Sequence, residues 1–180
     1  MDKAVLLRDI VKMFRMYRAL GDGAMAQIPD DAAFGTMLDP DSNSVAVVVQ
    51  HIAGNLRSRY RDFLTTDGEK ADRNRDGEFE THGPVTRSGV LKMWDEGWAV
   101  AFASLDALTP DDLDKTITIR GEPFLVIEAL NRSVTHTAYH VGQIVYLARH
   151  LAAPNWKSLS IPKGKSAEFS KGNFKSYLKT

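Results

Sequence analysis

The chain has 180 residues, of which 43% are hydrophobic and 26% charged, and its 23 basic side chains balance 23 acidic ones. This composition is typical of one folded globular domain and argues against general disorder. Cysteine is absent, which excludes disulfides, thiolate nucleophiles and thiolate-zinc sites, and no apolar run approaches the roughly 20 residues of a membrane-spanning helix. The absence of cysteine leaves the redox compartment unmarked, so we take the cytoplasm as the default location, and we expect no association with membranes.

Four long segments carry apolar side chains at intervals of three and four residues, which is the spacing of one face of a helix. They predict helices over residues 6–20, over about 43–66, from near 88 to 108, and over about 124–152. The valine-rich start of the second segment would also suit a strand, but its longer helical period favours a helix.

The connections between these segments contain proline, glycine and acidic clusters. Pro29 and Pro110 are each followed by two Asp and predict short helical turns, because proline suits the first helical position. Residues 67–87 have no period and predict a long crossover loop, while KTITIR (115–120) predicts one small β-hairpin before the last helix. The expected fold class is therefore all-α, a four-helix bundle with this loop and hairpin.

Charge is unevenly distributed along the chain. Residues 154–180 carry six Lys and one Glu, a net charge of +5, whereas residues 1–153 carry a net charge of −5. A few dispersed positive charges are a weak indication of nucleic-acid binding, and we expect no nucleic-acid partner. The sequence predicts a helical domain over residues 1–153 and a basic polar extension over residues 154–180, packed on that domain or trailing from it.

Two of the five histidines lie four residues apart on the predicted fourth helix. His136 and His140 therefore point the same way, one turn apart, and such a pair can ligate one ion from a single helix. A metalloprotease site is excluded, because Thr137 follows the first histidine where the protease motif has glutamate.

His51, on the predicted second helix, is the third candidate ligand. If the second and fourth helices are neighbours, its imidazole can converge with the pair, and three neutral nitrogens leave coordination positions open for water or substrate. Imidazole suits Zn²⁺ and Ni²⁺ alike. The alternative that these histidines are hydrogen-bonded core residues stays open at this point, since buried histidines are more often core residues than ligands.

Several polar residues are candidates for supporting roles around this site. Asn55 and Gln143, each one turn along from a histidine, are candidate outer-shell partners, and Arg132 could reach an anionic substrate or serve a surface role. Three alternating arginines are expected on solvated faces: Arg57, Arg59 and Arg61. Charged residues of the crossover loop could bind a polar substrate or pair among themselves, and pairing is the favoured expectation: Arg73, Arg75, Asp76 and Glu78.

The stretches SNSVAVVVQHIAGNLRSRYRDFLTTDGEKADRNRDGEFE (42–80) and RSVTHTAYHVGQIVYLARHL (132–151) carry a family resemblance. They resemble the DinB/YfiT-like superfamily and, more narrowly, its DUF1572 branch. The joint pattern of one histidine on the second helix and HxxxHxGQ on the fourth is what makes the resemblance specific.

This resemblance implies a four-helix bundle, often dimeric, with a three-histidine site for a divalent metal, commonly zinc or nickel. It implies His51, His136 and His140 as the ligands. Characterised superfamily members include metal-dependent transferases of low-molecular-weight thiols and thiol-dependent isomerases. We expect a homodimeric metal-dependent enzyme, a hydrolase or thiol S-transferase, with a metal-bound water or thiol as nucleophile and an unknown small-molecule substrate. The alternatives are a non-catalytic, stress-related metal-binding bundle and a helical interaction module.

Overall fold

The computed structural model describes residues 2–81 and 83–169. Within these residues the chain is predominantly helical, with one two-stranded antiparallel hairpin. The elements in chain order are α1 (Lys3–Met25), α2 (Asp31–Phe34), α3 (Val45–Tyr60), the 3-10 helix η1 (Asp76–Phe79), α4 (Arg87–Ala107), the 3-10 helix η2 (Pro110–Asp114), β1 (Thr116–Ile119), β2 (Glu122–Leu125), α5 (Val126–Ala152) and α6 (Ser166–Phe169).

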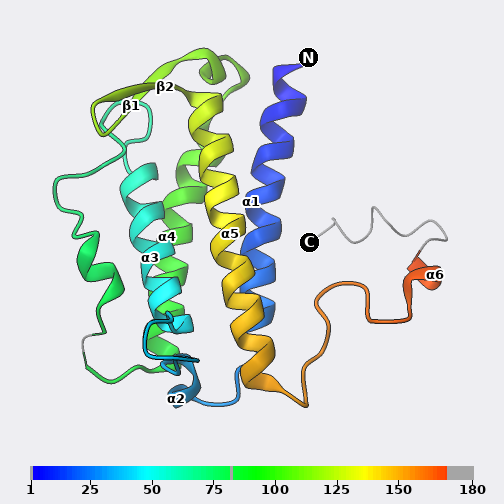
Figure 1. Cartoon of the computed structure of the whole chain (residues 1–180). Helices are drawn as coiled ribbons and strands as arrows, with labels where there is room; N and C mark the ends of the chain where they lie inside the picture. The colour runs from blue at the N-terminus through cyan, green and yellow to red at the C-terminus, as the bar shows by residue number, and fades with distance from the viewer. Residues whose placement is uncertain (1, 82, 170–180) are drawn as a thin grey trace.

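The long helices α1, α3, α4 and α5 run alongside one another, with the hairpin at one end and α2 at the other (Figure 1). Helix α3 packs against α4, α1 packs against α5, and α3 also contacts α5. The predicted hairpin and the predicted turns at Pro29 and Pro110 are confirmed as β1–β2, α2 and η2. The contact between α3 and α5 is the one that brings the candidate histidines together.

Local sequence signals fix where the long helices begin. The side chains of Asp2, Ser44 and Thr86 each accept a hydrogen bond from a backbone N–H in the first turn of α1, α3 and α4. Such caps satisfy amides that would otherwise have no intrahelical partner. At the start of α5, the carboxylate of Glu128 accepts from the Leu125 N–H at 2.8 Å.

Aromatic side chains fill the space between these helices. Phe14 of α1 meets Tyr60 of α3 and Trp98 of α4 edge to face, with ring centroids 5.9 and 6.4 Å apart. Trp94 and Trp98 are fully buried and also meet edge to face. Large buried rings in this geometry dominate core energetics, so they hold three of the long helices in a fixed relation.

The second long helix is shorter than the predicted range of 43–66. Helix α3 ends at Tyr60, and the chain then takes a left-handed conformation at Asp62, with φ of 50°. The apolar period continues past the end of the helix because Phe63 also packs on the Tyr60 ring, at 5.2 Å between ring centroids. Phe63 lies in the turn that follows α3 and not in the helix. The prediction of helix beyond Tyr60 is therefore wrong.

The connection over residues 67–87 is anchored to the elements on either side. The Asp67 carboxylate accepts from the backbone N–H groups of Arg120 and Gly121, each at 2.8 Å, and the Ser58 hydroxyl donates to the Gly68 carbonyl at 2.8 Å. The connection then passes along α3 and forms η1 against it (Figure 1). Residues 67–79 thus lie beside α3, and they include a helical turn that the sequence did not predict.

After α5 the chain returns to the end of α1. The Gln27 side chain accepts from the Lys157 N–H at 2.7 Å and donates to the Lys157 carbonyl at 3.1 Å. The predicted division into residues 1–153 and 154–180 stays a prediction, and residues 170–180 lie outside the described residues. Among the described residues, no helix has the length and apolar character required to cross a membrane.

Candidate metal centre

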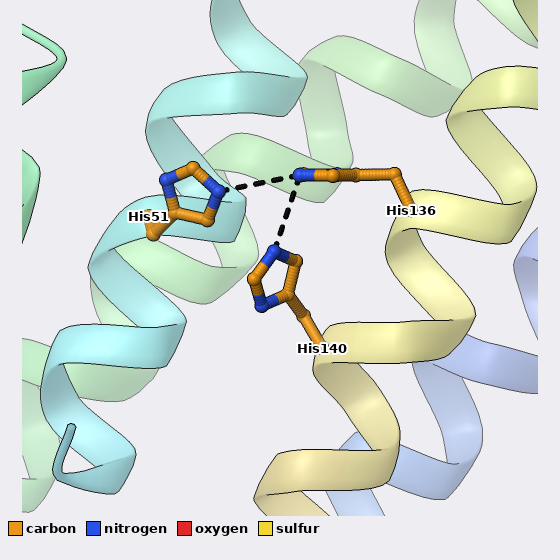
Figure 2. A group of neighbouring side chains, drawn as sticks. All are labelled: His51, His136 and His140. Atoms are coloured by element: carbon orange, nitrogen blue, oxygen red, sulfur yellow. Dashed lines mark hydrogen bonds between the residues drawn. The ribbon is translucent and has the colours of Figure 1, made fainter. Parts of the chain in front are cut away.

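Three histidines from two helices converge between α3 and α5 (Figure 2). The Nε2 atom of His136 lies 3.3 Å from Nε2 of His51 and 3.2 Å from Nε2 of His140. One ligand atom from each ring lies within 4.8 Å of the others. His136 and His140 share one face of α5, while His51 comes from α3 and is only 4% exposed. The convergence that required α3 and α5 to be neighbours is therefore present.

The outer nitrogens of two rings have partners that orient them. Nδ1 of His51 lies 2.8 Å from the carboxylate of Glu78, and Nδ1 of His140 lies 2.8 Å from the side-chain oxygen of Gln143. Both partners are acceptors, so each Nδ1 carries the proton and donates. In the neutral rings the Nε2 lone pairs of His51 and His140 then point to the shared centre beside His136.

Glu78 is itself a buried charge with two partners. Its side chain is 8% exposed and receives hydrogen bonds from Nε and Nη2 of Arg73 at 2.7 and 2.8 Å, in addition to the one from His51. Burial alone would raise the pKa of Glu78, but the hydrogen bonds from Arg73 and His51 outweigh it and lower that pKa. Glu78 is therefore ionised at neutral pH, and a carboxylate in this position would orient a ligating imidazole and raise its basicity.

A glycine on α3 makes room for this carboxylate. A Cβ at Gly54 would lie 2.2 Å from Oε1 of Glu78 and 2.7 Å from its carboxyl carbon, closer than packed atoms approach. Glu78 cannot easily move aside, because Arg73 and His51 hold it in place. Gly54 thus permits η1 to dock against α3 with its carboxylate pointing at His51.

Gly54→Ala is expected to displace Glu78 and to weaken divalent-metal binding by roughly 10–100-fold, the usual cost of losing an outer-shell partner. The control is Gly142→Ala on α5, where an added Cβ meets no atom within 4 Å. That control should leave metal affinity unchanged and stabilise the fold by up to about 1 kcal/mol, the helix-propensity gain of alanine over glycine. Metal titration and urea denaturation of both variants test this; equal metal affinities would contradict it.

Burial lowers the pKa of two of the histidines, His136 and His140, and so favours their neutral form. Desolvation, reinforced by His140 and His51, lowers the pKa of His136 to about 4. Desolvation also lowers the pKa of His140, although the hydrogen bond with Gln143 opposes it. Metal ligation requires neutral imidazole, so these two rings are ready to bind without losing a proton at neutral pH.

The metal-free protein is expected to lose stability as the pH falls from about 6.5 towards 4. His136 has a folded pKa of about 4 against an ordinary value of 6.5, so the unfolded state binds more protons in this window and the free energy of unfolding decreases. Urea denaturation with a chelator at pH 7, 6 and 5 measures the slope. His136→Gln should flatten it and His150→Gln should not; identical slopes for wild type and His136→Gln would contradict the prediction.

A cavity of about 270 Å³ opens beside the three histidines. The predicted supporting residues Asn55 and Arg132 line it, but neither makes a hydrogen bond to the histidines within the described residues. Gln143 does contact His140, as its position predicted. The Tyr139 hydroxyl accepts from the Gln143 amide at 3.4 Å, which leaves the amide oxygen facing His140.

Two expectations about the arginines have different outcomes. Pairing within the crossover loop is confirmed for Arg73 with Glu78. The expectation that Arg59 lies on a solvated face is wrong, because its side chain is 12% exposed and pairs with Glu69 at 3.1 Å. Its α3 face is covered by the connection that follows the helix, which periodicity alone does not reveal.

Sequence reasoning missed Glu78 as the partner of His51. The residue stands in a charged, aperiodic stretch, where a single carboxylate gives no spacing signal. The signal that could have indicated it is the small residue Gly54 one turn along α3 from His51, since a glycine inside a helix marks a close approach by another group.

Comparisons with known proteins place the chain in a family. No curated protein and no solved structure matches it. A family model described as "Protein of unknown function (DUF1572)" matches residues 3–165, which include all three histidines, Glu78 and Gln143. The part of the sequence-based resemblance that concerned this branch is thereby confirmed, and the chain belongs to the DUF1572 family.

Proposed function

We propose that His51, His136 and His140 bind one divalent cation. The observation that carries this proposal is the convergence of three Nε2 atoms, two of them with lone pairs directed inward by Glu78 and Gln143. Hydrogen bonding within the core does not account for this arrangement. With the protons of His51 and His140 on Nδ1, the Nε2 lone pairs of both rings face His136, whose Nε2 can carry only one proton to share between them.

The donor set fits a borderline transition-metal ion. Two nitrogens on one tetrahedral ion, each about 2.1 Å from it, lie about 3.4 Å apart. The separations of His51 and His140 from His136 are 3.3 and 3.2 Å. Imidazole donors of this kind suit Zn²⁺ or Ni²⁺, and three protein ligands leave further positions for a substrate, as in catalytic rather than structural sites.

We propose further that the chain is a metal-dependent enzyme, a hydrolase or a transferase of a small thiol. When bound, a divalent ion supplies Lewis acidity that lowers the pKa of a water or thiol towards neutrality. The protein's own groups do the positioning: Glu78 orients His51, Gln143 orients His140, and the adjacent cavity receives the substrate. Since the chain has no cysteine, a reacting thiol would come from a cosubstrate.

The link to the DinB/YfiT-like superfamily is part of the same proposal. It is supported by the side-by-side course of α1, α3, α4 and α5, which suits a four-helix bundle, and by the placement of the histidines on α3 and α5. The homodimer and the cytoplasmic location expected from sequence stay predictions.

Two measurements test the proposal and separate it from its alternatives. Elemental analysis of the purified protein, followed by titration of the chelator-treated protein with Zn²⁺ and Ni²⁺, should show one ion per chain; no bound ion would leave only a helical interaction module. Turnover of electrophilic substrates should then rise and saturate with an added low-molecular-weight thiol, or proceed with water alone. A metal-loaded protein inactive in both assays would favour the non-catalytic role.

A further inference from the structure

Arginines dominate the wall of the cavity beside the three histidines. The cavity of about 270 Å³ is lined by no Asp or Glu among the described residues. Its arginines come from α3, the long connection, the hairpin and α5: Arg59, Arg73, Arg75, Arg120 and Arg132.

Some of these positive charges are already neutralised by carboxylates that do not line the cavity. Arg73 is paired with Glu78 at 2.7 Å. Arg59 and Arg120 both reach Glu69, at 3.1 and 2.9 Å. Glu69 also reaches Arg73 at 3.4 Å, so Glu69 and Glu78 together serve all three arginines.

The other two arginines are not committed to a close ion pair. Arg75 is 52% exposed, and its nearest acidic partner is Asp76, itself 97% exposed, at 4.0 Å. Arg132 makes no ion pair with any residue that the structure describes, and its guanidinium lies 5.7 Å from the Phe124 ring centre. An aromatic face holds a guanidinium in place without neutralising it, so its hydrogen-bond donors remain available.

Both of these arginines lie near the candidate metal centre. The Arg75 guanidinium lies 5.7 Å from the centre of the Phe79 ring, and that ring lies 4.8 Å from the His51 ring. Arg132 stands on α5 one turn before His136. Arg75, from the long connection, and Arg132, from α5, therefore line the same cavity as the three histidines, so one ligand in that cavity can contact both.

We infer that this cavity binds a small organic anion, with Arg75 and Arg132 holding its carboxylate or phosphate oxygens. The inference rests on the proposed metal function, because it assigns the substrate class of that site. Guanidinium groups form paired, charge-assisted hydrogen bonds with the oxygens of either group. A volume of about 270 Å³ lies below that of pockets for drug-sized ligands, so the anion is a small metabolite rather than a polymer.

The test uses the zinc-loaded full chain, freed of excess metal, and two probes: inorganic phosphate and malonate. Titration calorimetry at constant ionic strength should give saturable binding of at least one probe. The variant Arg75→Gln/Arg132→Gln should weaken it about tenfold or more for each arginine removed, with zinc content unchanged. Arg8→Gln, an exposed arginine on α1, is the matched control and should bind as wild type does. The stronger probe shows whether phosphate or carboxylate is preferred.

The outcomes separate this inference from the metal proposal. Binding that survives in Arg75→Gln/Arg132→Gln but disappears in His136→Gln would place the anion on the metal and overturn the arginine site. Absence of binding of both probes to wild type would overturn it as well. Anion binding that depends on the two arginines in a wild-type protein unable to hold zinc would support the anion site and refute the metal function.

Discussion

Replacing His51 with alanine should abolish stoichiometric binding of Zn²⁺ or Ni²⁺. Two histidines would remain, both on α5, and the ion would lose the only ligand that comes from α3. The expected loss of affinity exceeds the 10–100-fold that an outer-shell partner contributes, because a direct bond to the ion is removed. Competition titration against a chromophoric chelator of known affinity measures the change.

Because His51 is buried, its alanine variant also tests whether the fold survives. His136→Gln, at a half-buried position, is the second variant and should lose metal to a similar extent. His150→Ala, at an exposed position in the last turn of α5, is the control and should retain one ion per chain. Circular dichroism should show a helical spectrum for all three. Full metal binding by folded His51→Ala and His136→Gln would refute the site.

Replacing Glu78 with glutamine should be costly both for stability and for metal affinity. The Arg73 side chain is 4% exposed and would lose its close carboxylate partner, keeping Glu69 at 3.4 Å. Breaking a buried pair by removing one partner costs about 3–5 kcal/mol. Metal affinity should fall roughly 10–100-fold, since His51 would face a neutral amide instead of the carboxylate that orients its ring and raises its basicity.

Urea denaturation of the chelator-treated variants and metal titration separate the two effects of Glu78. The double variant Arg73→Gln/Glu78→Gln removes both charges, so it should regain part of the lost stability but none of the metal affinity. Asp76→Asn, two residues earlier in η1 and with a side chain that is 97% exposed, is the control for both readouts. Wild-type metal affinity in Glu78→Gln would show that the carboxylate plays no part in the site.

Periodic features of the sequence were sufficient to predict most of the helical framework. Long apolar stripes and cap residues such as Ser44 identify α1, α3, α4 and α5, because burial repeats every three to four residues along a helix. The spacing of His136 and His140 likewise fixes their shared face. The proximity of His51 to this pair depended on which helices are neighbours, and periodicity does not encode that; the resemblance supplied it.

Features that depend on one contact between distant segments could not be predicted. The burial of Arg59 is set by Glu69 in the connection. Glu78 reaches His51 only because the chain after α3 folds back along that helix. Each of these contacts joins a residue of α3 to a residue of the aperiodic connection, so no local sequence pattern predicts it.

The docking of η1 against α3 has a thermodynamic consequence for the whole connection. Glu78 touches His51 only while this segment stays seated in the space left by Gly54. Any cation that gains affinity from that carboxylate must, by reciprocity, favour the seated state of the segment by the same free energy. Cation binding at the three histidines and docking of the η1 segment against α3 would therefore be thermodynamically coupled, so that each stabilises the other.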